Sequence, residues 1–416
     1  MNQSVRAIKS CRLCGAGELQ RYVDFGSVAL GNNLQESQEA ALSAATYPLE
    51  LHRCNTCGHF QLGHAVAPEL LYATNYTYLS GISPSFVKHF RQYATWAAEC
   101  SGIGVGSLVV DVGSNDGTCL KAFQALGATV CGVDPASLAA SIANGNGVET
   151  INGFFDADAV AEIIRRHGKA DFITSHNVLA HVDDLAAVFS DIYTLLKDGG
   201  HFAFEIGYFR EVLRTGCFDT TYHEHLDYHH AAPLARHLTA IGFDLVELSV
   251  NTIQGGSLRL LLRKTGRGEI LPAAAQFLEE ERESVLYDPE FLANWKARIE
   301  QQMDEFHRIL RGHADRGAAI VAYGAPTKAV LLMKMAGLGC DEVMFVVEDN
   351  VHKAGRFLPG TGVAIRPSSA LDDTKPNVIV IFAWNFADDI MDKLRGKFDQ
   401  SVEIVVPLPE LRTILL

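Results

Sequence analysis

From residue 107 to residue 263, short apolar runs typical of strands alternate with amphipathic stretches typical of helices. Helical patterns separate the first five predicted strands, which is the signature of right-handed βαβ units and a parallel sheet. The last two predicted strands follow one another without a helix, so we expect an antiparallel hairpin at one edge. The prediction is a doubly wound α/β domain with seven strands: Ser107–Val112, Ala128–Val133, Val148–Ile151, Asp171–Ser175, His201–Ile206, Phe243–Ser249 and Ser257–Arg263.

The length of the chain requires more than one domain. Its 416 residues exceed what one hydrophobic core ordinarily organises, so two or three domains are expected. We place a loop-rich zinc-binding module at residues 1–75, the seven-stranded domain at 76–265, and a helical connector with a Rossmann-like α/β domain at 266–416. The strands expected in the last part are Ala318–Tyr323, Glu342–Val347, Val378–Phe382 and Val402–Val406.

Two pairs of cysteines near the N-terminus have the spacing of a metal site. Two residues separate the cysteines of each pair, and the turn between them places both sulfurs on the same side. Four thiolates complete the tetrahedral shell of Zn²⁺, so a structural ion is expected. Nearby His52, His59 and His64 can replace a cysteine, but such histidines more often face solvent. The expected ligands are Cys11, Cys14, Cys54 and Cys57.

The turn after the first predicted strand is the expected cofactor site. It contains glycines and leads into a helix at Thr118–Ala125, where a ligand can approach backbone N–H groups. Acidic side chains before and inside the turn suit a cationic sulfonium and an ammonium group better than a pyrophosphate. The alternatives are an NAD-dependent Rossmann domain and a sheet without a ligand. The residues expected to bind the cofactor here are Asp111, Gly113, Asn115, Asp116 and Gly117.

Three further strand ends lie where ligands bind in open α/β sheets. Asp134 stands about 20 residues beyond the turn, where a carboxylate can accept both ribose hydroxyls. Phe155 and Asp156 follow the third strand and can contact adenine, and Asn177 follows the fourth. In order and spacing, the stretch from about 85 to 265 resembles the class I S-adenosylmethionine methyltransferases. The resemblance implies that S-adenosylmethionine is the cofactor.

A histidine-rich loop follows the fifth predicted strand. Between Thr220 and His230 the chain concentrates titratable side chains, with no apolar periodicity that would place them in a core. At the top of the sheet such a loop faces the methyl group of the cofactor, and histidine can act as a general base near neutral pH. A solvated polar loop and a second metal site are the alternatives.

Four motifs together resemble one enzyme family. They are YHEH at 222–225, NVLAHVDD at 177–184, the two CxxC pairs and YGAPTK at 323–328. Over essentially its whole length the chain resembles the deoxysugar C-methyltransferases, which methylate ring carbons of nucleotide-linked 4-ketosugars in antibiotic pathways. The resemblance implies a zinc-binding N-terminal domain, a central methyltransferase domain, and a C-terminal α/β domain that helps to hold the sugar nucleotide.

Methylation at a sugar carbon needs a base and a group that stabilises an enolate, because only a neighbouring ketone makes the proton on that carbon acidic enough. We expect His225 to be the base and Tyr222 to stabilise the enolate oxygen. Glu224 is expected to bind an amino or hydroxyl group at C3 or to orient a histidine. His181 is expected either to donate to the keto oxygen or to pack at the start of a helix.

A cluster of tyrosines precedes the central domain. We select Tyr76 from a group that includes Tyr72 and Tyr78 as a residue that covers the active site. The alternative is packing alone, which is the commoner role of such clusters.

The turn after the first C-terminal strand suits a phosphate. Backbone amides, a helix N-terminus and the ammonium group of Lys328 can meet an anion there. Lys353 and Arg356 add positive charge to an otherwise acidic chain, and Asn350 can contact the nucleoside. An NAD-binding domain and a purely structural domain are the alternatives. The residues expected to bind the substrate are Tyr323, Gly324, Ala325, Lys328, Asn350, Lys353 and Arg356.

The composition favours a small-molecule enzyme. A formal net charge of −14 argues against a broad basic surface for nucleic acid. The N-terminus lacks the apolar core of a secretory signal, and no later apolar run approaches the roughly 20 residues that span a bilayer. We therefore expect a cytoplasmic protein without a membrane or an obligate protein partner.

The predicted function is methylation of C3 in a dTDP-linked 4-keto deoxysugar, with a 3-amino sugar as one candidate, in antibiotic deoxysugar biosynthesis. The alternatives are C5-, N- or O-methylation of a nucleotide sugar, and a zinc-bearing RNA-binding methyltransferase. The histidine-rich loop favours carbon, because oxygen and nitrogen nucleophiles need less help from a base.

Overall fold

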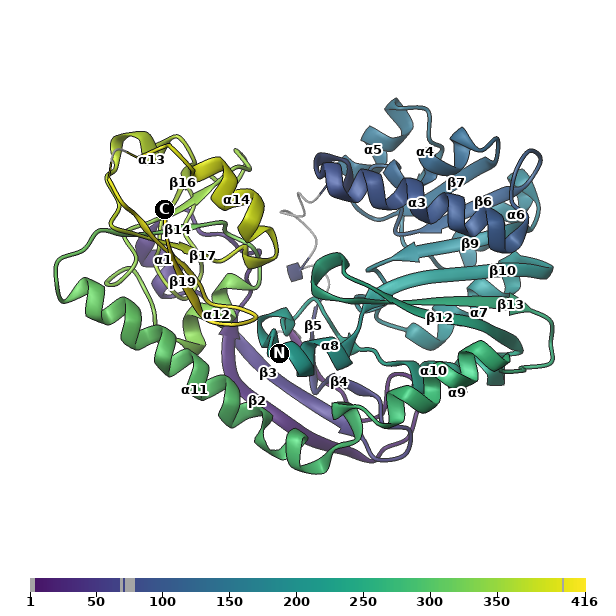
Figure 1. Cartoon of the computed structure of the whole chain (residues 1–416). Coiled ribbons are helices and arrows are strands. Elements are labelled where there is room, and N and C mark those ends of the chain that lie inside the picture. The colour runs from purple at the N-terminus through teal and green to yellow at the C-terminus, as the bar shows by residue number, and fades with distance from the viewer. Residues whose placement is uncertain (1–3, 68–69, 72–78, 399) are drawn as a thin grey trace.

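The computed structural model describes residues 4–67, 70–71, 79–398 and 400–416 (Figure 1). Its strands form sheets of seven, six and four strands and one small pair, β1 (Val5–Ala7) with β5 (His64–Val66). In Figure 1 the seven-stranded and six-stranded sheets lie on opposite sides of the molecule, and the four-stranded N-terminal sheet lies below and between them. The N-terminal strands therefore lie next to both larger parts.

The seven-stranded sheet has the order β12-β13-β10-β9-β6-β7-β8. Neighbours from β10 to β8 run parallel, whereas β13 is antiparallel to both β10 and β12. The predicted edge hairpin and the predicted class I methyltransferase fold are confirmed. The strands are β6 (Leu108–Val112), β7 (Thr129–Asp134), β8 (Thr150–Asn152), β9 (Ala170–His176), β10 (Leu196–Gly207), β12 (Phe243–Asn251) and β13 (Ser257–Lys264).

Helices cover both faces of this sheet, because successive residues of a strand point to opposite sides. In β6, Val109 packs in one core with Phe90 of α3 and Phe123 of α4, whereas Val110 belongs to the core that contains Phe189 of α7. Every residue of β6 is buried, as expected for a central parallel strand. The helices are α3 (Pro84–Ser101), α4 (Thr118–Ala125), α5 (Ser137–Gly145), α6 (Ala157–His167), α7 (Leu185–Leu195), α8 (Phe209–Thr215) and α9 (Ala231–Ile241).

The N-terminal segment contains a sheet where the sequence predicts mainly loops. Its antiparallel strands are β2 (Leu19–Ala29), β3 (Thr46–Cys54) and β4 (Phe60–Leu62), and α1 (Gln38–Leu42) lies between the first two in sequence. Two shifts in register interrupt β2, so buried and exposed residues do not alternate regularly along it. The outer strand next to β4 is β11 (Asp227–Tyr228), which comes from the histidine-rich loop.

The C-terminal sheet has the order β16-β15-β14-β17-β18-β19, and β18 and β19 form its antiparallel pair. The predicted connector is helical, as α10 (Pro272–Arg282) and α11 (Pro289–Ala314). The short, largely exposed strands β16 and β19 are additional to the prediction, because neither contains a buried apolar run. The elements are β14 (Ile320–Tyr323), α12 (Ala329–Met335), β15 (Val346–Glu348), β16 (Ile365–Pro367), α13 (Ala370–Asp373), β17 (Val378–Ile381), α14 (Ala387–Leu394), β18 (Glu403–Val406) and β19 (Arg412–Leu415).

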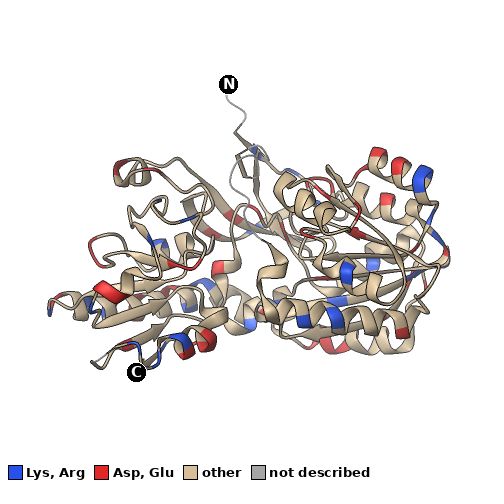
Figure 2. Ribbon diagram, turned by 90° about the horizontal axis from the view of Figure 1, so that it is seen from above, with Lys and Arg blue, Asp and Glu red and all other residues tan. Residues whose placement is uncertain are grey.

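Charged side chains of both signs are spread over the molecule. In Figure 2, positions of Lys and Arg are interspersed with positions of Asp and Glu along the helices of both large parts. Within the described part of the chain, no helix combines the length and the apolar character needed to cross a membrane.

Trp295 of α11 joins three parts of the fold. Its side chain is almost fully buried, and its ring lies 6.0 Å from that of Tyr22 and 6.5 Å from that of Phe25, both in β2. The ring of Phe209 in α8 lies 6.2 Å away. One indole group thus packs the connector against the N-terminal sheet and the methyltransferase domain.

Trp295→Ala should lower the free energy of unfolding by about 3–5 kcal/mol, because it removes a large buried ring and leaves a cavity between three elements. Urea unfolding followed by circular dichroism measures this loss. Lys296→Ala, at a side chain that is 44% exposed on the same helix, is the matched control and should cost less than about 0.5 kcal/mol. Equal losses in the two variants would contradict the packing role of Trp295.

Candidate active site

The carboxyl ends of four parallel strands meet at one edge of the seven-stranded sheet. These strands, β9, β6, β7 and β8, are neighbours in this order. The structure therefore brings together the strand ends that the sequence selects for the cofactor. The predicted residues that end or follow these strands are Asn177, Asp111, Asp134, Phe155 and Asp156.

The turn after β6 is tightly packed at its two glycines. Gly113 has φ +74°, and a Cβ added there would lie 2.2 Å from Cγ2 of Val178. Gly117 has φ +76°, and its added Cβ would lie 2.9 Å from side-chain atoms of Val148. A left-handed backbone and close neighbours both exclude a side chain at these positions. The glycines thus allow the turn to lie directly against the segments after β9 and before β8.

Two carboxyl groups beside the turn keep the capacity to bind a ligand. Asp134 accepts hydrogen bonds from the backbone N–H groups of Asn115 and Ala136, one at each oxygen and each 2.8 Å long. A carboxylate has about four acceptor sites, so one remains on each oxygen for a pair of hydroxyls. Oδ1 of Asp111 is buried without a hydrogen-bond partner among the described residues. Burial and the charge of Asp134 raise the pKa of Asp111, so a cationic ligand would relieve an unfavourable site.

Other predicted cofactor residues have partners within the protein. Asn115 accepts a hydrogen bond from the N–H of Ser80 at 2.9 Å, and Asp116 accepts one from the N–H of Gly81 at 2.8 Å. Asp156 caps α6 by accepting from two N–H groups of its first turn. These side chains hold the local structure of the site and fasten residues 80–81 to the turn.

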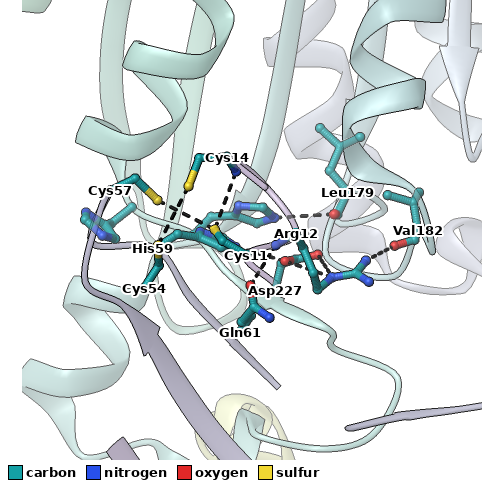
Figure 3. A network of polar contacts seen from close by, with 12 residues as sticks. Cys11, Arg12, Cys14, Cys54, Cys57, His59, Gln61, Leu179, Val182 and Asp227 are labelled. Atoms are coloured by element: carbon teal, nitrogen blue, oxygen red, sulfur yellow. Dashed lines mark hydrogen bonds and ion pairs between the residues drawn. The ribbon is translucent and has the colours of Figure 1, made fainter. Parts of the chain in front are cut away.

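The four cysteines form one cluster (Figure 3). Their Sγ atoms all lie within 4.8 Å of one another, with Cys11 3.6 Å from Cys57 and Cys14 3.7 Å from Cys54. Tetrahedral Zn²⁺ with four thiolates requires sulfur atoms about 3.8 Å apart, so the donor set fits this ion. No histidine belongs to this group in the described part of the chain. The predicted structural zinc site is confirmed.

Arg12 lies between the first two cysteines and reaches the histidine-rich loop (Figure 3). Its Nε donates to both carboxylate oxygens of Asp227, at 3.0 and 3.1 Å, and its guanidinium group also donates to the carbonyl of Val182. His59 contacts the same carboxylate at 2.9 Å. Burial opposes ionisation of Asp227, but Arg12 and His59 outweigh it and hold its pKa at about 2. The zinc module thus holds the loop two residues beyond His225.

Three histidines of the loop have structural contacts. His223, His229 and His230 are nearly fully buried, and each directs Nε2 to a backbone carbonyl at 3.0 to 3.3 Å. These carbonyls belong to β3, to the segment after β9, and to the turn that carries the second cysteine pair. The loop is therefore largely core, where the sequence predicts an open catalytic cluster.

Tyr222, His225 and His181 form a partly exposed group. Nδ1 of His225 lies 3.0 Å from the carbonyl of Thr220, and Nε2 lies 2.7 Å from the hydroxyl of Tyr222. Because a carbonyl only accepts, Nδ1 carries the hydrogen and Nε2 accepts from the tyrosine. The rings of His181 and His225 are 4.8 Å apart. Burial lowers the pKa of both histidines, that of His181 to about 4, so both are neutral near pH 7.

The two carboxylate oxygens of Glu224 differ in their contacts with the described residues. Oε1 accepts from the side-chain amide of Asn32 at 3.0 Å, and the amide oxygen of Asn32 accepts from the hydroxyl of Thr327 at 2.6 Å. Oε2 is buried and has no hydrogen-bond partner among the described residues. Burial raises the pKa of Glu224 to about 7, although hydrogen bonds from its own backbone and from Asn32 lower it. Three distant parts of the sequence thus meet at this side chain.

The predicted phosphate turn lies at the carboxyl ends of β14, β15 and β17, which are parallel neighbours. Nζ of Lys328 lies 3.6 Å from the centre of the Trp384 ring and donates to Asn385 at 3.0 Å. The indole N–H of Trp384 donates to Asp219 at 2.7 Å, immediately before Thr220. The C-terminal edge therefore contacts the segment that holds Nδ1 of His225.

The other predicted substrate residues have partners on the same edge. Gly324 has φ +88°, and a Cβ added there would lie 2.5 Å from Cβ of Ala383, so this turn also requires glycine. Internal contacts give the edge a defined geometry. Tyr323 donates to Asp349, Ala325 to Glu348, Lys353 to the carbonyl of Ala325 and Arg356 to Glu36, while Asn350 accepts from the N–H of His352.

The selected Tyr76, with Tyr72 and Tyr78, lies outside the described residues. Its role in covering the site stays a sequence-based hypothesis. A few residues further along the chain, Ser80 and Gly81 contact the cofactor turn.

Sequence reasoning misses Arg12, Asn32 and Asp227. Arg12 lies within the first CxxC pair, and Asp227 lies two residues after the YHEH motif. Their opposite charges are the one feature of the sequence that could have suggested a contact between them. Asn32 follows a glycine in what reads as an ordinary turn, and it lies 192 positions from Glu224 along the chain. A contact of that range leaves no local pattern.

Family models match three successive stretches: "Putative zinc binding domain" at residues 11–72, "Methyltransferase domain" at 86–248, and "C-methyltransferase C-terminal domain" at 252–409. C-methyltransferase NovU of Streptomyces niveus is 32% identical over 415 residues, which cover 100% of this chain and 99% of NovU. The chain belongs to the C-methyltransferases. The predicted family and the predicted use of S-adenosylmethionine are confirmed, and the protein is an S-adenosylmethionine-dependent C-methyltransferase.

Other similarities cover less of the chain. Ubiquinone biosynthesis O-methyltransferase of Ralstonia nicotianae is 34% identical over 101 residues, which are 24% of this chain and 42% of that protein. The structure of magnesium protoporphyrin IX methyltransferase (ChlM) from Synechocystis PCC 6803 with bound SAM matches 43% of this chain and 79% of its own, with 16% identity and a TM-score of 0.33.

Gly113→Ala should weaken binding of S-adenosylmethionine about tenfold or more, because the added methyl group forces the turn away from Val178. Isothermal titration calorimetry measures the affinity, and thermal melting checks that the variant folds. Gly104→Ala is the matched control, since its added Cβ has no neighbour within 4 Å. If both variants bind like the wild type, the packing of Gly113 does not shape the cofactor site.

Asp227→Asn should lower the free energy of unfolding by about 3 kcal/mol at pH 7, because it removes the buried carboxylate that pairs with Arg12 and leaves only the more distant, exposed Asp183 near that charge. In the wild type, a folded pKa of about 2 lies below the ordinary 3.8, so this contribution is complete above the ordinary value and is lost as pH falls toward 2. Chemical unfolding across that range should show less acid dependence in the variant.

Asp392→Asn is the control for that measurement. Asp392 lies 3.4 Å from Arg395 and its side chain is 74% exposed, so its loss should cost less than about 1 kcal/mol. A cost for Asp227→Asn as small as this would show that the buried pair does not stabilise the fold.

Proposed function

We propose that this enzyme methylates C3 of a dTDP-linked 4-keto deoxysugar in antibiotic deoxysugar biosynthesis. The observation that carries the proposal is the Tyr222–His225 pair, in which a neutral imidazole lies against the hydroxyl of a partly exposed tyrosine. Removal of a proton beside a ketone needs an unprotonated base and a nearby hydrogen-bond donor for the enolate. The full-length similarity to NovU, a C-methyltransferase, supports carbon as the methylated atom.

His225 takes the proton of C3 at Nε2. The carbonyl of Thr220 keeps the hydrogen on Nδ1, so the lone pair of Nε2 points toward Tyr222. When substrate binds, the tyrosine hydroxyl turns to the keto oxygen, and Nε2 becomes free to accept the proton while the C–H electrons move into the enolate. Burial disfavours a charged imidazolium, so the transfer depends on strong stabilisation of the enolate oxygen.

Tyr222 and His181 supply that stabilisation. A neutral imidazole donates one hydrogen bond, and the pKa of about 4 keeps His181 neutral beside His225. The ring of His181 also bonds to the backbone of Glu224 and of Asn177, so on substrate binding it exchanges one of these bonds for the keto oxygen, without placing a positive charge against the protonated base. Glu224, whose Oε2 has no partner among the described residues, accepts from an amino or hydroxyl group at C3.

When bound, S-adenosylmethionine supplies an electrophilic methyl group on a sulfonium. Asp134 offers its remaining acceptor sites to the ribose hydroxyls, and the buried Asp111 faces positive charge of the cofactor. Phe155 and Asn177 line the adenine at the ends of β8 and β9.

The C-terminal edge holds the nucleotide. Backbone amides after β14 and the ammonium group of Lys328 bind the diphosphate, and Lys353 and Arg356 add positive charge beside it. Burial lowers the pKa of Lys328, and an anionic phosphate would favour its charged form. Asn350 contacts the nucleoside at the end of β15.

The substrate class is tested by incubating the enzyme with S-adenosylmethionine and a panel of nucleotide-linked 4-ketosugars. Mass spectrometry detects the added methyl group, and NMR locates it. The proposal expects methylation at C3 of a dTDP-linked sugar. If NMR places the methyl group at C5, on nitrogen or on oxygen, the proposed C3 methylation is wrong and the enzyme catalyses that alternative reaction.

His225→Asn should abolish both methyl transfer and exchange of the C3 hydrogen with solvent deuterium, because it removes the base. Affinity for S-adenosylmethionine should stay within about twofold, since the cofactor contacts lie elsewhere. His167→Asn on α6, whose side chain contacts Glu149, is the matched control and should keep exchange and transfer. Retained exchange in His225→Asn would remove this residue from the role of base.

A further inference from the structure

Asn32 connects the three parts of the protein at the active site. It follows β2 of the N-terminal sheet, donates to Glu224 of the histidine-rich loop at 3.0 Å, and accepts from Thr327 of the C-terminal turn at 2.6 Å. Both bonds use the side-chain amide, one at each end. The zinc module thus contributes a side chain that bonds directly to a residue of the site.

The two partners fix the orientation of the Asn32 amide. When Glu224 is ionised, a turned-over amide would direct its oxygen at the carboxylate, and two acceptors would oppose each other. In the observed orientation the hydroxyl of Thr327 donates to the oxygen and the NH₂ group donates to Oε1. The hydrogen bonds therefore run in one direction, with Thr327 donating to Asn32 and Asn32 donating to Glu224.

The contact with the C-terminal turn is also fixed by the backbone. A Cβ added to Gly31 would lie 2.2 Å from the carbonyl oxygen of Thr327, so the main chains of the two segments touch at this point. A glycine at 31 is required for that approach. Because Thr327 is followed by Lys328, the position of the proposed diphosphate site is tied to the position of Asn32.

The second oxygen of Glu224 has no hydrogen bond with the described residues. Glu224 is 3% exposed, and its Oε2 is buried without a partner among the described residues. A buried acceptor of this kind is costly to leave unsatisfied, and it is expected to receive a donor when the site is filled. With Oε1 held by Asn32, the direction of Oε2 is determined.

We propose that Asn32 is a positioning residue of the active site, which together with Thr327 fixes the Glu224 carboxylate so that Oε2 receives a hydrogen bond from the substituent at C3 of the sugar. The inference rests on the proposed function, because it takes Glu224 to face the sugar. It assigns to the zinc module and to the C-terminal turn a joint part in substrate alignment. Asn32 itself does not touch the reacting atoms.

An exchange of hydrogen-bond polarity tests this role. Asn32→Asp places a carboxylate against the carboxyl group of Glu224. Because the pKa of Glu224 is about 7, the repulsion depends on pH, so the kinetics are compared at about pH 8.5. Glu224→Gln allows an NH₂ group to replace Oε2 at the sugar. Each single variant should lose about 30-fold or more in kcat/KM for the sugar. In the double variant, Gln at 224 donates to Asp at 32 and keeps its oxygen toward the sugar, so activity should recover at least about tenfold over either single variant.

The readouts separate positioning from folding. Affinity for S-adenosylmethionine and the melting temperature should stay near wild type in all variants, so the loss should lie in the kinetics toward the sugar. Asn33→Ala is the matched control, since this neighbouring side chain is exposed, and it should leave kcat/KM unchanged. Wild-type kinetics in Asn32→Asp, or a double variant no better than the worse single variant, would overturn the proposal.

A second pair of variants avoids a buried new charge. Thr327→Val keeps the shape of the side chain but removes the donor to Asn32, and it should lower kcat/KM about tenfold. Thr327→Ser keeps the hydroxyl and should act nearly as the wild type. Equal kinetics for Val and Ser at this position would contradict the role of the Thr327–Asn32 hydrogen bond.

The two proposals fail in different ways. A wild-type enzyme that methylates none of the 4-ketosugars overturns the proposed function and, with it, the sugar-facing role of Asn32 and Glu224. A wild-type enzyme that methylates one of them, with Asn32→Asp and Thr327→Val equally active, overturns the positioning role alone.

Discussion

The arrangement of the site depends on the buried ion pair between Arg12 and Asp227. Arg12 is held in a turn whose two cysteines belong to the zinc cluster, and Asp227 lies in β11 at the edge of the N-terminal sheet. The same guanidinium group binds the carbonyl of Val182, in the segment that carries His181. A charge fixed by the metal site therefore orients both segments that supply histidines to the proposed chemistry.

The three buried histidines of the loop are held by backbone groups. His223, His229 and His230 use carbonyls of three different segments, so each ring satisfies a buried acceptor while it fills space. Leu226 continues this pattern with its own main chain, donating to Ala180 and accepting from Leu62. What remains open is a small part of the loop, and it is the part where His225 and Tyr222 lie.

Local patterns explain which features were predictable. The alternation that yields β6 to β10 and the spacing of the cysteines are encoded over a few residues, so the methyltransferase fold and the zinc site follow from the sequence. β2 escapes prediction because its register shifts remove the period of two. The candidate base and its neighbours could be selected from one motif, but the division between His225 and the buried His223 and His229 depends on carbonyls far away in the chain. The same distance conceals Asn32 from any local pattern.

The two-residue strand β11 has a consequence for how such enzymes can be recombined. Although it lies in the middle of the chain, its hydrogen bonds belong to the N-terminal sheet through β4. In a chimaera that exchanges residues 1–67 alone, the new N-terminal sheet would have to pair with a β11 strand from the other enzyme. In one that exchanges the central domain alone, the new β11 would have to pair with the original N-terminal sheet. The zinc module and the loop at 220–230 therefore form one structural unit, although they are separate in sequence. A working chimaera must exchange both together, and we expect their residues to change together in evolution.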